Sequence, residues 1–282
     1  MSSWIVLTFL YGMCKGFFDC AKKKASQKNS THEVLGFFTL FSFLLAAISC
    51  KNVLDISYTS LLIIFFKSSI CVIAWILSLN VMRKISVSLY GVTNVSRVLF
   101  SILLGVLIFN EQLTFLKFIG IIIVIIGLIC MNIISTDTKN KKKSFKYILI
   151  LLIACFLNSI ASIIDKGIMS YVTPSQLQFW FLLFSTIIYW ILIFIKKEKI
   201  NFKSIKNNYW ILLASIFLVF GDKLLFIANN IPESKVTIMT VIKQISTIEI
   251  IILGKLLFKE KNILKKLLCS ILVILGIILT II

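Results

Sequence analysis

The sequence has few of the residues from which metal centres and hydrolytic sites are built. Its one histidine, His32, cannot by itself form a metal site or a histidine-based catalytic triad. The seven cysteines contain no CxxC pair, so we interpret them as small buried hydrophobic residues. The longest strongly polar stretch, Ser135–Lys146, has the length of a loop and leaves no room for a soluble catalytic domain. We therefore expect no enzymatic activity and no cofactor.

Hydrophobic residues make up most of what is present. They account for 59% of the chain, and the mean hydropathy is +1.03. Soluble domains contain roughly 45 to 50% apolar residues, so this composition favours a membrane protein. The net charge of +19 is spread over loops between apolar runs, without an aromatic and basic module that would indicate nucleic-acid binding. We expect no nucleic acid among the partners, and assign the charge to topology and to anionic membrane lipids.

One segment occurs twice, 149 residues apart. Leu104–Glu111 reads LGVLIFNE and Leu253–Glu260 reads LGKLLFKE. The same offset pairs further residues on both sides: Asn80 with Asn229, Gly105 with Gly254, Phe109 with Phe258, Glu111 with Glu260, and Gly127 with Gly276. A membrane unit has therefore been duplicated, as in transporters built from two related halves.

Apolar runs long enough to span a hydrocarbon core of roughly 30 Å divide each half into five expected helices. The expected spans are 4–24, 33–50, 58–80, 87–109, 115–134, 147–168, 174–195, 209–230, 236–257 and 263–282. Because five is odd, the two halves must cross the membrane in opposite directions. We predict an all-α membrane protein with ten transmembrane helices in two inverted five-helix repeats. The first repeat covers 1–136, a basic cytoplasmic linker covers 137–146, and the second repeat covers 147–282.

The basic residues predict an orientation. Most of them fall in five loops on one face, at 22–28, 83–84, 139–146, 196–206 and 255–266, whereas the other face holds Lys51, Lys117, Lys166 and Lys235. The positive-inside rule places the basic loops in the cytoplasm and both termini outside the cell. No signal-peptide n-region precedes the first span, so we expect that span to be retained in the membrane.

Ionisable residues inside the spans mark the candidate site, because a charge there is expensive and usually faces a partner or a water-filled cavity. The repeat offset pairs Asn94 with Lys243 and Arg97 with Ser246, which places polar groups at matching depths in the fourth and ninth spans. A structural ion pair is the alternative role for Lys67 and for Arg97. The predicted substrate-binding residues are Arg97, Lys243, Lys67, Asn94, Asp222, Lys223, Gln244 and Ser246.

Three further residues are candidates for gating or coupling. Lys15 and Asp19 are four residues apart on one helix face, where they can also simply neutralise each other. Glu249 follows Lys243 by six residues and can carry a coupling proton, although an ordinary buried ion pair is the simpler role. Asp222 cannot pair with the adjacent Lys223, so we expect its partner to be Lys67 or Lys243. Glu111 and Glu260 are expected to have a structural role in helix turns.

Deep cations outnumber deep acids in this count. Lys15, Lys67, Arg97, Lys223 and Lys243 are set against Asp19, Asp222 and Glu249. An anionic or zwitterionic substrate would balance this excess, whereas a lipophilic cation would worsen it.

The arrangement resembles a known family. Two inverted halves, each closing in LGxLxFxE before a glycine-containing last span, are similar to the EamA branch of the drug/metabolite transporter superfamily. The resemblance covers the whole chain. It implies a secondary transporter with a central cavity lined by the first, third, fourth, sixth, eighth and ninth spans. Relatives are usually drawn with both termini in the cytoplasm, and the lysine distribution here departs from that orientation.

The expected function is alternating-access transport of a small polar metabolite, anionic or zwitterionic, across the cell membrane. Two alternatives use the same fold: a flippase for a lipid-linked sugar or polyprenyl phosphate, and a multidrug exporter. A membrane-embedded enzyme is a more distant alternative, since no nucleophile arrangement stands out in the spans. A coupling proton or sodium ion and membrane lipids are the further expected partners, and the chain is expected to be a monomer or a homodimer.

Overall fold

The computed structural model describes residues 3–50, 52–100, 104, 114–135, 141–198, 200–231, 233–234, 239 and 242–281. Within these ranges the protein is helical, with eleven helices and no strand. The first half contains α1 (Ser3–Ala25), α2 (Thr31–Ser49), α3 (Tyr58–Met82), α4 (Val87–Asn94) and α6 (Phe115–Ser135). The second half contains α7 (Lys141–Ile168), α8 (Pro174–Ile195), α9 (Phe202–Lys206), α10 (Tyr209–Asn229), α12 (Ile245–Phe258) and α13 (Ile263–Ile281).

The count of ten membrane helices is established only in part. Seven helices, α1, α2, α3, α6, α7, α8 and α10, are long and apolar enough to cross a membrane. The fourth, ninth and tenth expected spans each include residues outside the described ones, and the fourth and ninth are interrupted. The short helix α9, which the sequence did not predict, begins in a basic loop where the Asn201 side chain accepts a hydrogen bond from the backbone N–H of Ser204.

Side-chain caps set where several of the long helices begin. Ser30 and Glu33 form a capping box at the start of α2, and Thr173 and Gln176 form another at the start of α8. Each box satisfies backbone N–H groups that have no partner within the first helical turn. These N–H groups lie near the expected membrane boundary, where the caps replace hydrogen bonds that water would otherwise provide.

Corresponding helices of the two halves pack side by side and run in opposite directions. At the α6–α13 interface, Gly127 faces Val273 and Gly276 faces Val124, so one residue number rises as the other falls. The pair α2 and α8 shows the same sense, since Phe37 contacts Trp190 and Phe43 contacts Phe179. The repeats are therefore inverted.

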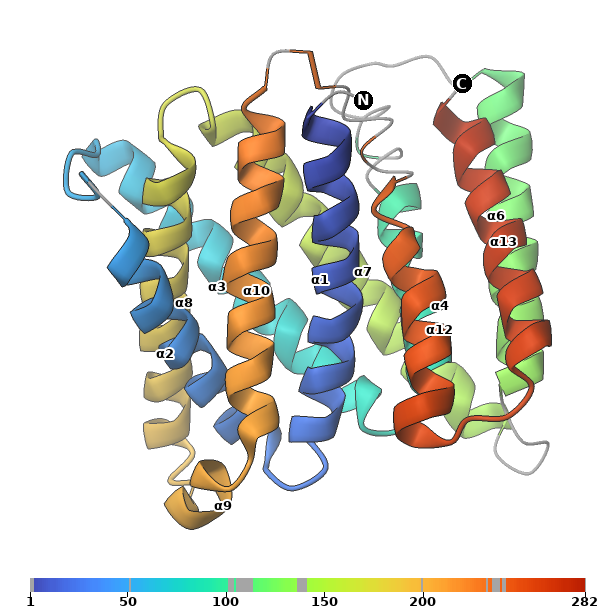
Figure 1. The fold of residues 1–282 in the computed structure, drawn as a ribbon, viewed down its shortest axis with the longest axis horizontal. Helices are drawn as coiled ribbons and strands as arrows, with labels where there is room; N and C mark the ends of the chain where they lie inside the picture. The colour runs from blue at the N-terminus through green and yellow to red at the C-terminus, as the bar shows by residue number, and fades with distance from the viewer. Residues whose placement is uncertain are drawn as a thin grey trace.

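The contacts between halves follow a pseudo-two-fold pattern. Helix α1 packs along α10, and α7, the counterpart of α1, packs along α3, the counterpart of α10. Exchange of the halves likewise turns the α3–α8 contact into the α10–α2 contact, and the α1–α12 contact into the contact of α7 with residues 96–100, where Phe100 lies against Phe156. Figure 1 shows α6 and α13 together at one end, and α2 beside α8 at the other. Most helices thus bury one face against the opposite half.

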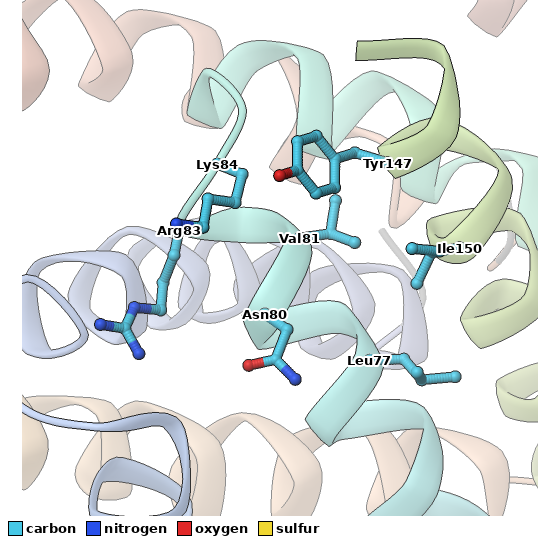
Figure 2. A pocket seen from close by; sticks show the side chains of 7 residues that line it. All are labelled: Leu77, Asn80, Val81, Arg83, Lys84, Tyr147 and Ile150. Carbon is cyan, nitrogen blue, oxygen red and sulfur yellow. The ribbon is translucent and has the colours of Figure 1, made fainter. Parts of the chain in front are cut away.

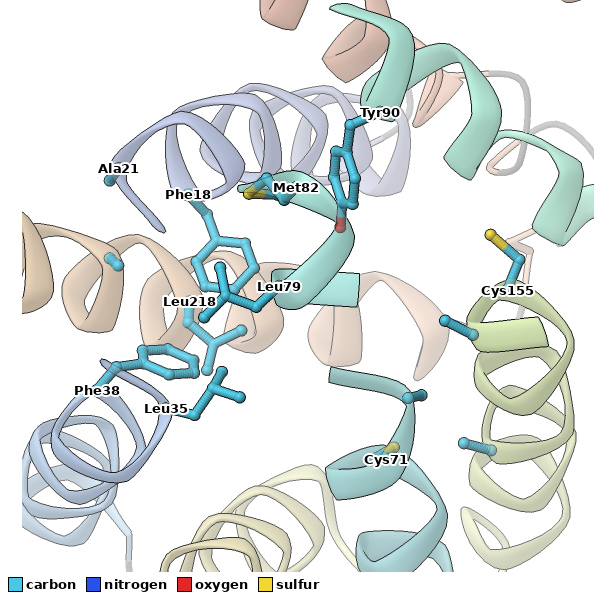
Figure 3. Packing of buried hydrophobic residues seen from close by; sticks show 14 of the residues in the cluster. Phe18, Ala21, Leu35, Phe38, Cys71, Leu79, Met82, Tyr90, Cys155 and Leu218 are labelled. Atoms are coloured by element: carbon cyan, nitrogen blue, oxygen red, sulfur yellow. The ribbon is translucent and has the colours of Figure 1, made fainter. Parts of the chain in front are cut away.

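A continuous apolar core joins these helices. Phe18 of α1, Phe38 of α2, Leu79 of α3 and Leu218 of α10 are all buried and lie close together in Figure 3. By contrast, α6 and α13 expose rows of large apolar side chains: Phe115, Ile129 and Ile133, and Leu264, Leu268 and Leu275. Such rows suit contact with lipid chains rather than with water.

Both chain ends lie at the same edge of the molecule, opposite the short helix α9 (Figure 1). This agrees with a chain that crosses the membrane an even number of times. It also agrees with the expectation that the termini and the basic loop between α8 and α10 lie on opposite faces. The chain is a multi-pass membrane protein in this arrangement, and the side that faces the cytoplasm remains a prediction from charge.

Close contact at the α6–α13 interface gives a stability prediction. A methyl group on Gly276 would approach the backbone O of Gly120 and the backbone N of Val124, each at 2.9 Å. We expect Gly276→Ala to destabilise the protein by about 1 to 3 kcal/mol through overpacking. Thermal unfolding of the purified protein measures this change. Gly167→Ala is the matched control, because nothing lies within 4 Å of its added methyl group; equal melting temperatures for the two variants would contradict the prediction.

Candidate functional site

The fourth and ninth spans are broken at equivalent positions. Helix α4 ends at Asn94, Val95 forms a turn, and the helix resumes at Ser96. In the second half, Lys243 and Gln244 form a turn immediately before α12. The repeat offset of 149 residues superposes Asn94 and Val95 on Lys243 and Gln244. Discontinuous helices of this kind form the substrate and ion sites of many inverted-repeat transporters.

Local hydrogen bonds hold both breaks in the same way. The N–H of Val98 donates to Val95 O at 2.9 Å, and the N–H of Thr247 donates to Gln244 O at 2.9 Å, so both turns tighten to an i to i−3 pattern. A serine hydroxyl assists each turn: Ser246 Oγ donates to Lys243 O at 2.8 Å, and Ser96 Oγ donates to Thr93 O at 2.7 Å. Serine thus satisfies a carbonyl that the interrupted helix leaves open.

Arg97 lies just past the first break and is held by α7. Its Nη2 donates to Ser162 Oγ at 2.5 Å, and its backbone O accepts a hydrogen bond from Ser159 Oγ at 2.8 Å. The side chain of Asn94, at the break itself, accepts a hydrogen bond from the Cys155 thiol at 3.5 Å. Sequence reasoning identified Arg97 and Asn94 but missed Ser159 and Ser162, whose signal was two polar residues inside an apolar span.

Lys243 lies at the second break and faces the same centre as Arg97. It interacts electrostatically with Arg97 and Asp222, and its Nζ lies 5.7 Å from the centroid of the Tyr11 ring. Tyr11 of α1, which the sequence analysis did not single out, in turn interacts with Asp222 and Arg97. Residues from α1, α10 and both broken spans therefore converge.

Lys67 pairs with an acid that the sequence analysis left out of the site. Its Nζ lies 2.9 Å from Asp165 Oδ1 on α7 and 3.6 Å from the centroid of the Phe181 ring on α8. The sequence predicts Lys67 or Lys243 as the direct partner of Asp222. Asp165 takes that place at Lys67 because α3 packs along α7, and Asp222 interacts with Lys67 only as one charge among several.

Of the remaining predicted residues that the structure describes, Asp222 interacts with the other charged residues of the site, whereas Lys223 does not. Asp222 is half-buried on α10 and interacts electrostatically with Lys67, Lys15 and Arg97. Gln244 is buried at the second break. Lys223 is half-buried next to Asp222, and within the described part of the chain no hydrogen bond or ion pair joins it to the cluster. We call the group formed by Tyr11, Lys67, Arg97, Asp165, Asp222 and Lys243 the central cluster.

The candidate coupling residues lie between α1 and α12. Asp19 is buried and forms ion pairs with Lys15 at 3.1 Å and with Lys22 at 3.4 Å. The expected Lys15–Asp19 pair therefore forms, with Lys22 as an additional partner. Glu249 of α12 lies against Gly16 of α1, where a side chain at position 16 would overlap its carboxyl group.

A cavity of about 360 Å³ lies away from the central cluster (Figure 2). It is formed between the end of α3 and the early part of α7, and is lined by Leu77, Asn80, Val81, Arg83, Lys84, Tyr147 and Ile150. Arg83 and Lys84 belong to one of the basic loops. Because this cavity lies at the end of the helices, it does not locate the substrate site, and the broken helices give the better guide.

Glu260 has the structural role expected of it, and it joins the two halves. Its Oε1 accepts a hydrogen bond from the Val87 backbone N–H at 2.6 Å, and its Oε2 accepts from Ser88 Oγ at 2.5 Å and from Lys266 Nζ at 2.7 Å. The carboxylate thus caps the N-terminus of α4, where negative charge is favoured. Its repeat partner Glu111 and most of the first LGxLxFxE segment lie outside the described residues.

These contacts control the ionisation of Glu260. Burial alone raises the pKa of its carboxyl group, but hydrogen bonds from Lys266 and Ser88 and the charges of Lys266 and Lys23 outweigh burial. The pKa therefore lies below the ordinary value of 4.5. An acid with a lowered folded-state pKa stabilises the protein above its ordinary pKa, and this contribution is lost as the pH falls below that value.

We expect Glu260→Gln to lower the free energy of unfolding near neutral pH by about 1 to 3 kcal/mol, since a charged hydrogen-bond acceptor is removed. The difference from the wild type should shrink as the pH falls below 4.5, where the native carboxylate becomes protonated. Melting temperatures measured across this pH range check both points. Lys261→Gln, an exposed change in the same turn, serves as the control. A difference that stays constant with pH would contradict the assigned role.

A sequence model of the EamA-like transporter family matches residues 2–133 and again 145–282. No curated protein matches the chain. Among solved structures, 19 chains match. One, described only as the crystal structure of a protein, has a TM-score of 0.63 at 9% identity and covers 96% of this chain and 95% of its own. That likeness supports the fold alone. The family match in both halves shows that this chain belongs to the EamA-like transporter family of the drug/metabolite transporter superfamily.

Proposed function

We propose that this protein moves a small polar metabolite, anionic or zwitterionic, by alternating access, and that the metabolite binds at the central cluster. Membership of the EamA-like family indicates a membrane transporter. The observation that carries the finer proposal is the convergence of Arg97 and Lys243 from two symmetry-related helix breaks. Each residue comes from a different half, so one bound anion would contact both.

Formal charge around the centre favours an anion. The cations Lys15, Lys22, Lys67, Arg97 and Lys243 outnumber the acids Asp19, Asp165 and Asp222. Two lysines share Asp19, and Lys67 contacts Asp165. Asp222 is the acid that interacts electrostatically with both Arg97 and Lys243. A carboxylate or phosphate between these two cations would reduce their mutual repulsion in a medium of low dielectric constant.

The two cations offer different kinds of contact. A guanidinium group is a planar fork that binds a carboxylate or phosphate through two hydrogen bonds, whereas an ammonium group acts as a point charge. Arg97 is already oriented by Ser162, so little side-chain entropy remains to be lost when a ligand binds. The N-terminus of α12 begins beside Lys243 and adds a positive helix dipole at the same break.

Asp222 supplies the opposite charge and suits a zwitterion. Its carboxylate lies on α10, across from the broken spans, and interacts with Lys67, Lys15 and Arg97. In the absence of substrate it neutralises part of the positive charge. An incoming amino group would meet Asp222 while the acidic group of the same ligand meets Arg97 and Lys243.

Binding tests the proposal directly. We expect a panel of amino acids, carboxylates and sugar phosphates to contain a ligand that stabilises the wild type, by about 2.7 kcal/mol when present at 100 times its dissociation constant. Arg97→Gln and Lys243→Gln should abolish this stabilisation, because each removes a charge that contacts the anion. A thermal-shift screen measures the effect.

Lys255→Gln is the matched control, since Lys255 lies on the same helix as the second break but is exposed. Unchanged ligand stabilisation in both Arg97→Gln and Lys243→Gln would sink the proposal. If soluble anions fail in proteoliposomes while a labelled polyprenyl phosphate crosses the bilayer, a flippase replaces the metabolite carrier. Recovery of the transported compound without chemical change separates transport from enzymatic activity.

We also propose that the basic loops face the cytoplasm and both termini lie outside. In a variant without native cysteines, Ser2→Cys should react with an impermeant maleimide added to intact cells, because the N-terminus would be extracellular. Ser144→Cys, in the expected cytoplasmic linker, should react only after the membrane is permeabilised. Reaction of the second variant but not the first in intact cells would reverse the orientation.

A further inference from the structure

Glu249 lies at an interface between the two halves, and the pseudo-two-fold symmetry relates this interface to a second one. It lies on α12 against Gly16 of α1, and one turn earlier Ile245 lies against Gly12. The two glycines, four residues apart, let α12 approach the α1 backbone closely. Exchange of the halves converts this α1–α12 interface into the contact of α7 with residues 96–100. An inverted-repeat carrier changes its open side by loosening one such interface while it tightens the other.

The carboxyl group of Glu249 is buried without a hydrogen-bonding partner. Both of its oxygens are inaccessible, and within the described residues neither has a donor. Two nearby acids differ in this respect: Asp19 has two lysines, and Glu260 has three donors. An ionised carboxylate that lacks both a cation and hydrogen bonds costs several kcal/mol in an apolar setting, whereas the neutral acid costs much less.

The surroundings of Glu249 strengthen this preference for the neutral acid. From α1, the titratable groups near it are Cys14, Asp19 and Cys20; α4 contributes Tyr90, which interacts with Asp19, and α13 contributes Lys266, which is paired with Glu260. The charge closest in effect is therefore the negative one on Asp19, which opposes a second negative charge at Glu249.

The repeat itself does not require an acid at this position. The offset of 149 residues pairs Glu249 with Phe100, an apolar residue whose ring lies 5.6 Å from that of Phe156. The fold therefore accepts a hydrophobic side chain at the equivalent site of the other half. An acid at this position in one half only makes the two symmetry-related interfaces respond differently to protonation.

We propose that Glu249 is the binding site of the coupling proton, and that loss of this proton opens the α1–α12 interface. This inference rests on the proposed alternating-access function. The protonated carboxyl group fits the closed contact with Gly16. Ionisation places a second negative charge beside Asp19, where no donor among the described residues compensates it, so the carboxylate gains solvation only when α12 separates from α1. Proton binding and interface closure thus favour each other.

Carbodiimide labelling tests the protonation without any substrate. N,N′-dicyclohexylcarbodiimide reacts with a protonated carboxyl group in an apolar site; the acid proton passes to a carbodiimide nitrogen, and a carboxyl oxygen bonds to the central carbon. In the purified full chain in lipid nanodiscs, we expect label at Glu249 near neutral pH, a loss of label as the pH rises, and none in Glu249→Gln. Glu260, held by three donors, is the internal control and should remain unlabelled.

Accessibility of Cys20 tests the coupling. Cys20 is 1% exposed and packs against Ile250 of α12, whereas Cys71 is 5% exposed on α3. Mass spectrometry after maleimide treatment of the full chain compares both residues in the same sample. The ratio of wild-type to Glu249→Gln labelling should rise several-fold with pH at Cys20 and stay near one at Cys71. The comparison with Glu249→Gln removes the ordinary effect of pH on thiol reactivity.

Two results would overturn the inference: absence of carbodiimide label at Glu249 across the pH range in which the protein stays monodisperse, or a Cys20 ratio that does not change with pH. Neither measurement requires a transported compound. Loss of anion binding in the Arg97 and Lys243 variants, together with a failed Glu249 result, would leave the carrier function in place and remove only the proton site. Unchanged anion binding in the Arg97 and Lys243 variants, together with a positive Glu249 result, would leave a proton-sensitive interface in a protein whose substrate differs from the one proposed.

Discussion

A charge inside a membrane needs a partner of opposite sign, and in this protein the partner of Lys67 comes from the other half. Lys67 of α3 is 3% exposed and contacts Asp165 of α7, while its ammonium group also lies over the Phe181 ring. Breaking such a pair leaves an uncompensated buried charge, at a cost of about 3 to 5 kcal/mol. The ion pair therefore fixes α3 against α7, the interface from which Ser159 and Ser162 orient Arg97.

The two helix breaks are enclosed by the same packing of one half against the other. In an unbroken helix, the regular backbone geometry would fix the directions in which the Arg97 and Lys243 side chains project. The turns at Val95 and at Lys243–Gln244 free backbone groups and redirect the following segments, while serine hydroxyls satisfy the carbonyls that the breaks expose. Irregular backbone at membrane depth is tolerated where protein surrounds it, and here α7 packs on α4 and α1 packs on α12.

Three carboxyl groups, Asp19 on α1, Glu249 on α12 and Glu260 just after α12, show how surroundings assign different tasks to one type of side chain. Asp19 is neutralised by two lysines on its own helix, and Glu260 is held by a helix N-terminus, a hydroxyl and a lysine. Glu249 has close contact with a glycine instead of a donor, which favours the protonated form. The first two carboxyl groups hold neighbouring elements together, and only the third has no cation or hydrogen-bond donor beside it among the described residues.

The sequence by itself determined the membrane class, the duplication and the inverted sense of the halves. These depend on composition, on a repeat that can be counted, and on the parity of crossings, and none of them requires knowledge of packing. It did not predict the breaks, since the fourth and ninth spans were expected to be continuous. Depth and repeat offset nevertheless selected four residues that lie at or beside the breaks: Asn94, Arg97, Lys243 and Ser246. Only the tertiary structure decided the partners. Asp165 joined Lys67, and Tyr11 joined Lys243, because partner choice depends on which helices pack together and at what rotation. A linear pattern of apolar residues with almost uniform hydropathy on every face does not specify that rotation.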